Sequence, residues 1–251
     1  ISIHHFRNQH WESEKFSTNS IFSHQTNIPF AYDNNGTYWL STSQGIIRYD
    51  GKFTTIFNEA NAGFISDRSL DVELDKNGYP ACTFFNTSTN ETYISRYDGA
   101  DWKSFKINPL FDGKNNPIYI IPIINFDSLN QIMLPTYGGG IIRIHDTIQE
   151  YLRANGSLSI GSDTVLQVLS DKEGGLWCLH SGNSPDKLLS YFDGTSWKYI
   201  GSSTTTGFSP QTFMLDADKH IWLSSVTGLH FYDGTSWTTY DKSNSPLPKG
   251  T

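Results

Sequence analysis

The stretch DRSLDVELD, residues 67–75, holds the densest group of side chains suited to chemistry. Alternate side chains of an extended strand point to opposite faces, so we expect Asp67, Ser69, Asp71 and Glu73 on one face. Three carboxylates on one wall would bind a cation or accept hydrogen bonds from sugar hydroxyls. A hydrated wall without a ligand explains the same pattern, and both interpretations stay open.

Three further residues are candidates for ligand contact. His180 opens a loop and is the histidine best placed for a site, although histidines in this setting are more often solvated loop residues. Tyr137 and Phe84 carry rings that would stack on a sugar, or else belong to the core. The sequence has no H-E-x-x-H, G-x-S-x-G or calcium-loop pattern. We therefore assign no catalytic residue, no metal and no cofactor.

Two recurring patterns define the elements that must position these residues. The hexamer FDGTSW at 192–197 returns as YDGTSW at 232–237, with related copies at 48–53 and 96–102. A second pattern, led by Asp, precedes each full copy with a period of 42 to 52 residues. Periods of this length with several short strands are typical of propeller blades. The leading aspartates are Asp33, Asp75, Asp127, Asp171 and Asp216.

Each repeat is expected to form four antiparallel strands, named a to d in chain order. Asp with Gly or Asn marks the a–b and c–d joints, because these residues tolerate the positive φ of tight hairpin turns. A large aromatic follows the c–d turn and is expected to wedge between neighbouring blades. Trp102, Trp197 and Trp237 hold this place, with Phe53 and Trp11 in the other copies. In the last repeat the strands are expected at 211–216, 220–225, 228–233 and 236–240.

The sequence therefore predicts an all-β fold, a β-propeller of four-stranded antiparallel blades in a single domain over 1–251. Five complete repeats and an N-terminal half-blade favour a six-position ring. A five-bladed ring with an added hairpin is the alternative, and a fragment of a longer chain is a third. The expected divisions are a half-blade at 1–16, repeats at 17–57, 58–107, 108–152, 153–200 and 201–241, and a linker at 242–251.

The composition of the chain excludes two classes of partner, nucleic acid and the membrane interior. The net charge is −7 and only 17% of residues are charged, with no basic run, so nucleic acid is excluded. No apolar stretch approaches the roughly 20 residues of a membrane span, so we expect no membrane insertion. Cys82 and Cys178 stand where other repeats have a core leucine, which predicts two buried, free thiols.

The variable loops indicate where a site would lie. The b–c and d–a loops differ in every repeat, whereas the hairpin-turn side repeats the same letters and looks structural. Loops on a rigid scaffold concentrate binding residues, so we place the site on the variable side, at the mouth of the central channel. The innermost strands should turn their polar side chains to the channel and Phe30, Val72, Ile124, Val168 and Phe213 away from it. The candidate ligand contacts are Asp67, Asp71, Glu73, Phe84, Asn125, Tyr137, Gln167, His180 and Thr212.

The YDG turns, paired with a D-x-x-G-x-x-W-L-S-T pattern, resemble the two-component regulator propeller repeats. The segments STSQGIIRYDGKF (41–53) and PTYGGGIIRI (135–144) match the passage from strand b to strand c closely. The resemblance covers almost the whole chain, but its motifs are structural. The third repeat departs by lacking both the Trp and the Asp-Gly turn, and nothing resembles a kinase, receiver or DNA-binding part.

This resemblance implies an extracytoplasmic sensor region of the kind carried by hybrid sensor kinases of Bacteroidetes, often specific for glycan fragments. We therefore expect a periplasmic or secreted propeller that senses a small polar ligand, such as an oligosaccharide, without catalysis. A protein–protein interaction platform is the first alternative. A propeller lyase or hydrolase using Asp71, Glu73 and His180 is the second.

Overall fold

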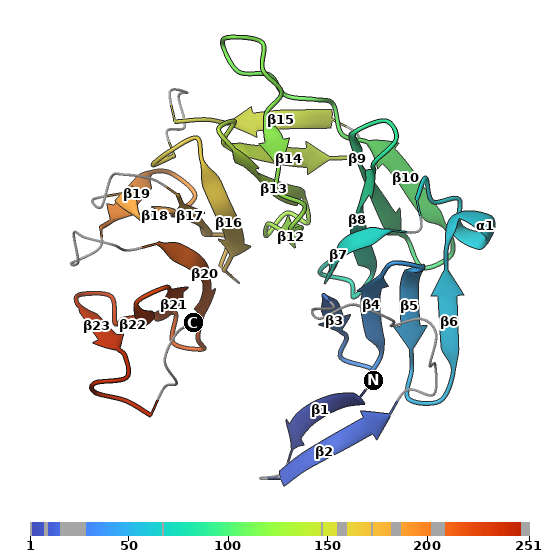
Figure 1. Ribbon diagram of the computed structural model, residues 1–251, viewed down its shortest axis with the longest axis horizontal. Helices are drawn as coiled ribbons and strands as arrows, with labels where there is room; N and C mark the ends of the chain where they lie inside the picture. Colours follow the sequence, from blue (N-terminus) through green and yellow to red (C-terminus); the bar gives the residue numbers. More distant parts are fainter. Residues whose placement is uncertain are drawn as a thin grey trace. The chain divides into compact units, whose positions relative to one another are not determined.

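The computed structural model forms two compact units, residues 1–105 and 106–251, and each is described by itself. Regular structure in the described residues is β except for α1 (Glu59–Ala62), which Asn58 caps (Figure 1). No helix among them has the length and apolar character needed to cross a membrane. The structure describes residues 2–7, 10–15, 29–66, 68–146, 148–154, 160–171, 173–181, 187–201 and 209–246.

Unit 1 contains an N-terminal hairpin and two four-stranded antiparallel sheets. Each four-stranded sheet runs in chain order, so consecutive strands are joined by hairpins, as predicted for a blade. The hairpin is β1 (Ser2–Arg7) with β2 (His10–Lys15). The first sheet is β3 (Phe30–Tyr32), β4 (Tyr38–Thr42), β5 (Gly45–Tyr49) and β6 (Thr54–Phe57). The second is β7 (Ser69–Leu74), β8 (Pro80–Asn86), β9 (Glu91–Tyr97) and β10 (Trp102–Lys106), whose last residue already belongs to unit 2.

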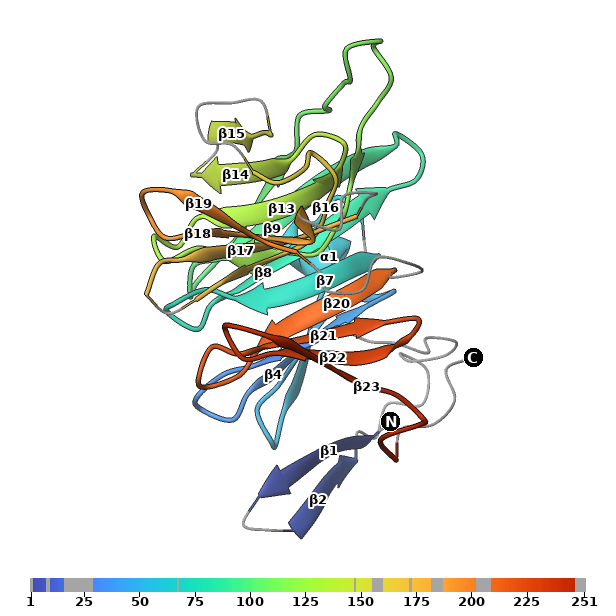
Figure 2. The same ribbon diagram turned by 90° about the vertical axis from the view of Figure 1, so that its left-hand side faces the viewer.

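Unit 2 contains three further antiparallel sheets. Two have four strands: β16 (Val165–Ser170), β17 (Leu176–His180), β18 (Leu189–Phe192) and β19 (Trp197–Ile200), then β20 (Pro210–Leu215), β21 (Ile221–Ser225), β22 (Gly228–Tyr232) and β23 (Trp237–Tyr240). Figure 2 shows β20 to β23 side by side in chain order. The bounds of these four strands confirm the expected strands of the last repeat.

The sheet of the third repeat is irregular at its first strand. Two short strands, β11 (Tyr119–Ile120) and β12 (Asn125–Phe126), both pair with β13 (Ile132–Tyr137), which continues to β14 (Ile141–His145) and β15 (Ile148–Leu152). Pro122 lies between β11 and β12, and proline has no backbone N–H to donate to a ladder. The interrupted strand leaves β11 as a short edge beside the end of β13.

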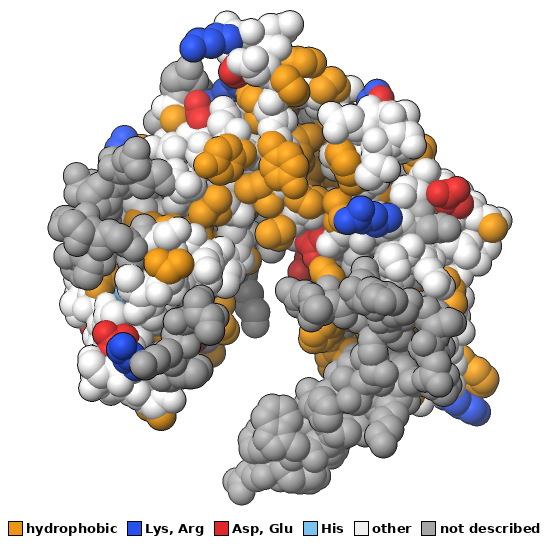
Figure 3. Space-filling model, in the orientation of Figure 1, with side chains coloured by type: hydrophobic (Ala, Val, Ile, Leu, Met, Phe, Trp, Pro, Cys, Tyr) orange, Lys and Arg blue, Asp and Glu red, His pale blue; other side chains and the backbone are white. Residues whose placement is uncertain are grey.

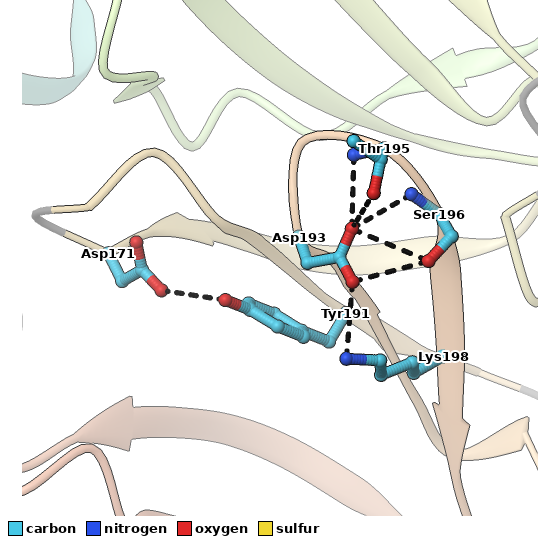
Figure 4. A network of polar contacts seen from close by, with 6 residues as sticks. All are labelled: Asp171, Tyr191, Asp193, Thr195, Ser196 and Lys198. Carbon is cyan, nitrogen blue, oxygen red and sulfur yellow. Dashed lines mark hydrogen bonds and ion pairs between the residues drawn. The ribbon is translucent and has the colours of Figure 1, made fainter.

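The repeated hexamer forms a turn that its own aspartate stabilises (Figure 4). Asp193 Oδ1 accepts hydrogen bonds from the backbone N–H groups of Thr195 (3.0 Å) and Ser196 (2.9 Å) and from the Thr195 hydroxyl (2.7 Å). Its Oδ2 lies 3.1 Å from Lys198 Nζ. These hydrogen bonds, led by that of the Thr195 hydroxyl, lower the pKa of the Asp193 carboxyl. Gly194 takes a φ of 95°, which explains the glycine of the hexamer.

The aromatic residue after each turn packs on the preceding sheet. Trp102 joins a cluster with Trp39 of the first sheet, Trp197 one with Met133 of the third, and Trp237 one with Trp177 of the fourth. The predicted wedge is therefore confirmed for these three residues. It is wrong for Phe53, which is 63% exposed and has the Lys52 Nζ 5.0 Å from its ring centroid. The side chain of Trp11 lies outside the described residues.

The cysteines match their prediction. Cys82 and Cys178 are free and fully buried, and each belongs to a hydrophobic cluster of its own unit. Burial raises the pKa of both thiols, so both stay protonated at neutral pH.

Candidate functional site

The acidic inner strand of unit 1 departs from the expected alternation. The register of β7 against β8 shifts between Ser69 and Asp71, which places a bulge at Leu70. Ser69 is buried, and its hydroxyl oxygen accepts a 2.7 Å hydrogen bond from the Ser41 hydroxyl of the neighbouring sheet. The prediction that Ser69 shares a polar face with the acidic residues is therefore wrong. Asp67 lies outside the described residues.

Asp71 and Glu73 remain together as a half-buried acidic pair beyond the bulge. Burial raises the pKa of Glu73, and the nearby charge of Asp71 raises it further, against a hydrogen bond from the Leu74 backbone N–H. A carboxyl with a raised pKa can both donate and accept hydrogen bonds when protonated. This pair suits hydroxyl-bearing ligands, because its carboxyl oxygens accept hydrogen bonds.

The polar inner-strand residues of unit 2 hold neighbouring sheets together. Gln167 Oε1 accepts hydrogen bonds from the Thr212 hydroxyl (2.8 Å) and the Phe213 backbone N–H (2.9 Å), and its Nε2 donates to the Phe213 carbonyl (3.1 Å). Asn125 Oδ1 accepts from the Ser170 backbone N–H at 3.3 Å. Their amides are therefore largely engaged within the protein, and Thr212 alone of the three is exposed.

The apolar sides of the inner strands follow the prediction with one exception. Phe30 is 56% exposed, so its expected place on the packed side is wrong. The four remaining residues are at most 3% exposed: Val72, Ile124, Val168 and Phe213.

Phe84 and His180 lie in the interior, so the prediction that both are ligand contacts on the surface is wrong. Phe84 has no exposed surface and packs against Phe64, with ring centroids 4.6 Å apart. His180 ends β17 instead of opening a solvated loop, and only 3% of it is exposed. Burial lowers the pKa of His180 to about 4, and its Nε2 contacts the Ser190 hydroxyl. The histidine is therefore neutral at pH 7.

Tyr137 lies on the surface as predicted, and the structure adds a second tyrosine beside it. In the register of β11 against β13, Tyr119 stands directly opposite Tyr137. The two residues are 65% and 58% exposed. Ile123, just beyond β11, is 44% exposed. Figure 3 shows hydrophobic side chains gathered over β11 to β13. We call Tyr119 and Tyr137 the tyrosine pair.

The loop that follows Tyr137 is held rigidly. The N–H groups of Gly138 and Gly140 both donate to the Asp163 carbonyl, at 3.1 and 2.7 Å, and Gly139 donates to the Thr136 hydroxyl at 2.9 Å. A Cβ at Gly140 would lie 1.9 Å from the Leu152 carbonyl oxygen, so only glycine fits there. A Cβ at Gly138 would meet nothing within 4 Å, so the space above this loop is open to a ligand.

Unit 1 also carries a groove of about 590 Å³ between the sheets β3–β6 and β7–β10, on the side of the hairpin turns. Four aromatic residues line it: Trp39, Phe57, Tyr79 and Tyr97. Its volume falls within the range of small-molecule sites. The groove lies on the side that the repeated letters led us to interpret as structural.

A potential metal cluster at the a–b turn of the last sheet is explained by turn geometry. Ligand atoms of Asp216, Asp218 and His220 lie within 4.8 Å of one another. The Asp216 carboxylate already accepts the backbone N–H groups of Asp218 (3.0 Å) and His220 (2.9 Å) and the indole N–H of Trp222 (3.2 Å). The cluster is a hairpin turn with a histidine beside it, and it adds no ligand site.

No protein-family model and no curated protein matches the sequence. Solved structures do resemble the fold. The extracellular domain of a hybrid two-component system from B. thetaiotaomicron aligns with a TM-score of 0.59 and 18% identity, over 86% of this chain and 31% of that one. A catalytically inactive virginiamycin B lyase from Staphylococcus aureus, solved with quinupristin, aligns with a TM-score of 0.66 and 11% identity, over 95% of this chain and 76% of that one. The structure of YCF48 bound to D1 peptide aligns with a TM-score of 0.60 and 12% identity, over 96% of this chain and 74% of that one.

These likenesses, with the observed sheets, show that the fold is a β-propeller with four-stranded antiparallel blades. The two-component structure among them agrees with the repeat family that the sequence resembles. The chain spans about a third of the length of that structure. The number of positions in the ring and the single-domain boundaries stay predictions.

Sequence reasoning missed Tyr119 and the groove for identifiable reasons. Tyr119 sits in a segment whose strand is interrupted at Pro122, so the period-2 pattern that would place it is short. The groove depends on which side chains two repeats bring to one seam. A comparison of equivalent positions across repeats, such as Arg48 with Tyr191, would have shown that the residues at this seam differ between unit 1 and unit 2.

Proposed function

We propose that the chain is the sensing propeller of an extracytoplasmic protein, periplasmic or secreted, and that it binds an oligosaccharide without turning it over. The observation that carries the proposal is the tyrosine pair on the variable-loop side of unit 2. Two large rings exposed on facing residues of adjacent strands are unusual for a surface without a partner. Tyrosine rings stack on the apolar faces of sugars while their hydroxyls remain available for hydrogen bonds.

The surroundings of the pair support a preformed site. The 138–140 loop is fixed by hydrogen bonds to Asp163 and Thr136, so little conformational entropy would be lost when a ligand binds beside it. Ile123 extends the apolar surface next to β11. Independently of the tyrosine pair, we also propose Asp71 and Glu73 of unit 1 as contacts for hydroxyl groups, through the acceptor oxygens of a half-buried acidic pair.

The proposal excludes catalysis because the described residues present no activated nucleophile. His180 is buried and neutral, its Nε2 contacts the Ser190 hydroxyl, and its Nδ1 has no hydrogen-bond partner among the described residues. Asp163 acts on this histidine through its charge and does not orient the ring by a hydrogen bond. The carboxylate partner of His220 is Asp216, at 3.2 Å, and that pair belongs to a hairpin turn. We expect no turnover of simple ester, phosphate or glycoside substrates.

The test is a screen on a glycan array, followed by calorimetry with the best neutral oligosaccharide. Each stacked ring contributes about 0.5–1.5 kcal/mol, so Tyr119→Ala and Tyr137→Ala should each weaken binding about 2- to 10-fold. Tyr151→Ala is the matched control, because Tyr151 is a 39% exposed tyrosine on β15 of the same unit. An Asp71→Ala, Glu73→Ala double variant tests the acidic pair separately.

Binding that survives loss of both tyrosines would remove the tyrosine pair from the site. If no glycan binds and a protein partner instead requires Tyr119 and Tyr137, the interaction-platform alternative is correct. A turnover rate that His180→Ala or Glu73→Gln abolishes would establish the lyase or hydrolase alternative.

A further inference from the structure

The groove of unit 1 differs in chemistry from the tyrosine pair and belongs to the other unit. Two basic side chains, Arg48 and Lys76, line it together with one acidic side chain, Asp33. The whole chain carries a net charge of −7, so a lining with more basic than acidic groups is a local exception. Such a lining favours a ligand with negative charge.

Arg48 is the residue best placed to bind that charge. Its guanidinium carbon lies 5.8 Å from the centroid of the Trp39 ring, which holds the planar group over the aromatic wall. Its acidic neighbour is Asp50, with 3.7 Å between Nη1 and Oδ2, which is too long for a hydrogen bond. The Asp50 Oδ1 instead accepts the backbone N–H groups of Lys52 and Phe53. The guanidinium thus has donors to offer in the fork geometry that a carboxylate accepts.

The aromatic walls are positioned by contacts that glycine permits. Tyr79 lies 38% exposed and packs edge-on against Tyr97, with ring centroids 6.1 Å apart. A Cβ at Gly99 would come within 2.8 Å of the Tyr79 hydroxyl, so Gly99 is needed for this tyrosine to lie where it does. Trp39 and Phe57 stack at 6.0 Å on the other sheet. The groove therefore offers rings from both of its walls.

The equivalent seam in unit 2 shows what closes such a groove. There Lys219 and Glu173 form an ion pair between the neighbouring sheets, and Tyr191 packs on Trp177 with ring centroids 4.3 Å apart. Tyr191 also donates a 3.3 Å hydrogen bond to Asp171, drawn in Figure 4.

In unit 1 the two positions of that ion pair hold Asn35 and Gly78, both of which line the groove. A Cβ added at Gly78 would meet nothing within 4 Å. Arg48 stands where unit 2 has Tyr191, since each pairs with the Trp of its strand b. Unit 1 therefore lacks the ion pair that spans the seam in unit 2, and it has a guanidinium where unit 2 has the Tyr191 ring.

We propose that this groove binds a small carboxylate attached to a ring. The carboxylate pairs with Arg48, with Lys76 nearby, and the ring lies among Phe57, Tyr79 and Tyr97. A sugar acid and an aromatic acid share this chemistry, and the experiment distinguishes them. The site is separate from the tyrosine pair, so either proposal can fail alone.

The experiment is calorimetry on the full chain with three probes: digalacturonate, its neutral counterpart galactobiose, and phenylacetate. We expect one of the two acids to bind and galactobiose to bind at least 10-fold more weakly, with affinity falling as salt is added. Arg48→Gln should weaken binding of that acid roughly 10- to 100-fold, which corresponds to the loss of charge-assisted hydrogen bonds. Arg143→Gln is the matched control, because Arg143 is the equivalent arginine of the third sheet and pairs with Glu150.

A second variant closes the groove without touching Arg48. Asn35→Glu with Gly78→Lys copies the ion pair of unit 2, and Lys219 shows that lysine adopts the positive φ of this turn position. We expect this double variant to lose acid binding while staying folded, with a urea midpoint slightly below that of the parent because Gly78 has a positive φ. Binding of neither acid, or acid binding unchanged in both Arg48→Gln and the double variant, would overturn the proposal. Tyr119→Ala with Tyr137→Ala should leave acid binding unchanged.

Discussion

Two tryptophans of unit 2 hold equivalent places but differ in one hydrogen bond. Trp237 Nε1 donates to the Gly201 carbonyl at 2.8 Å, whereas Trp197 Nε1 is buried without an acceptor. Each ring otherwise packs on the tyrosine or phenylalanine of the preceding strand, with centroids 5.0 and 5.2 Å apart. Trp237→Phe should therefore destabilise the protein more than Trp197→Phe.

The size of the difference follows from the hydrogen bond alone. Both substitutions remove the same apolar atoms from similar half-buried places, so that loss cancels in the comparison. Trp237→Phe removes a bond with a net value of about 0.5–1.5 kcal/mol and leaves the Gly201 carbonyl to find another donor. Trp197→Phe removes an N–H whose burial without a partner costs about 1–3 kcal/mol. We expect Trp237→Phe to cost about 1.5–4.5 kcal/mol more, because the lost bond and the relieved burial cost add in the comparison.

The assay is urea unfolding followed by far-UV circular dichroism, with the free energies compared at a common slope. Both residues lie in unit 2, so any separate unfolding of unit 1 affects the two variants equally. A Trp197→Phe variant as destabilised as Trp237→Phe would refute the reasoning, because the indole N–H groups would then have equivalent partners. Replacement of either residue by Ala should cost about 3–5 kcal/mol, as for other packed aromatic residues.

Two further predictions follow from buried groups. His180 has a folded-state pKa of about 4, below the usual 6.5, so the unfolded chain binds the extra proton between these values and stability should fall as pH drops from 6.5 to 4. His180→Asn should flatten that fall in urea midpoints measured across this range, and an unchanged slope would contradict the assignment. Cys82 and Cys178 should resist thiol reagents in the native protein and react together with unfolding in urea, and fast labelling of either thiol at zero urea would show that it is accessible.

The sequence alone determined the blade architecture, because the signals for it are local. Where a hairpin turn begins with aspartate, that side chain caps the turn, as Asp193 shows, and glycine adopts the positive φ that the turn needs. The cysteines were equally predictable, since they replace leucine at a position that every repeat buries. The tryptophan wedge followed too, because a large ring at a fixed place in a repeat can bury itself only against the next repeat.

The candidate sites depended on contacts that no local pattern encodes. A bulge at Leu70 turned Ser69 toward Ser41, although the letters around it alternate strictly. His180 and Phe84 look like loop and surface residues in the sequence, yet β8 and β17 extend far enough to carry both into the interior.

The tertiary structure also decided what the two surfaces offer. Tyr119 meets Tyr137 only because Pro122 interrupts the inner strand and lets β11 pair with the end of β13. The groove exists only because two neighbouring repeats bring Asn35 and Gly78 to a seam that Lys219 and Glu173 span elsewhere. Turns and strand periods are set by residues a few positions apart, whereas a seam is set by side chains about 40 positions apart. Which side chains meet at a seam is therefore decided only when the sheets pack.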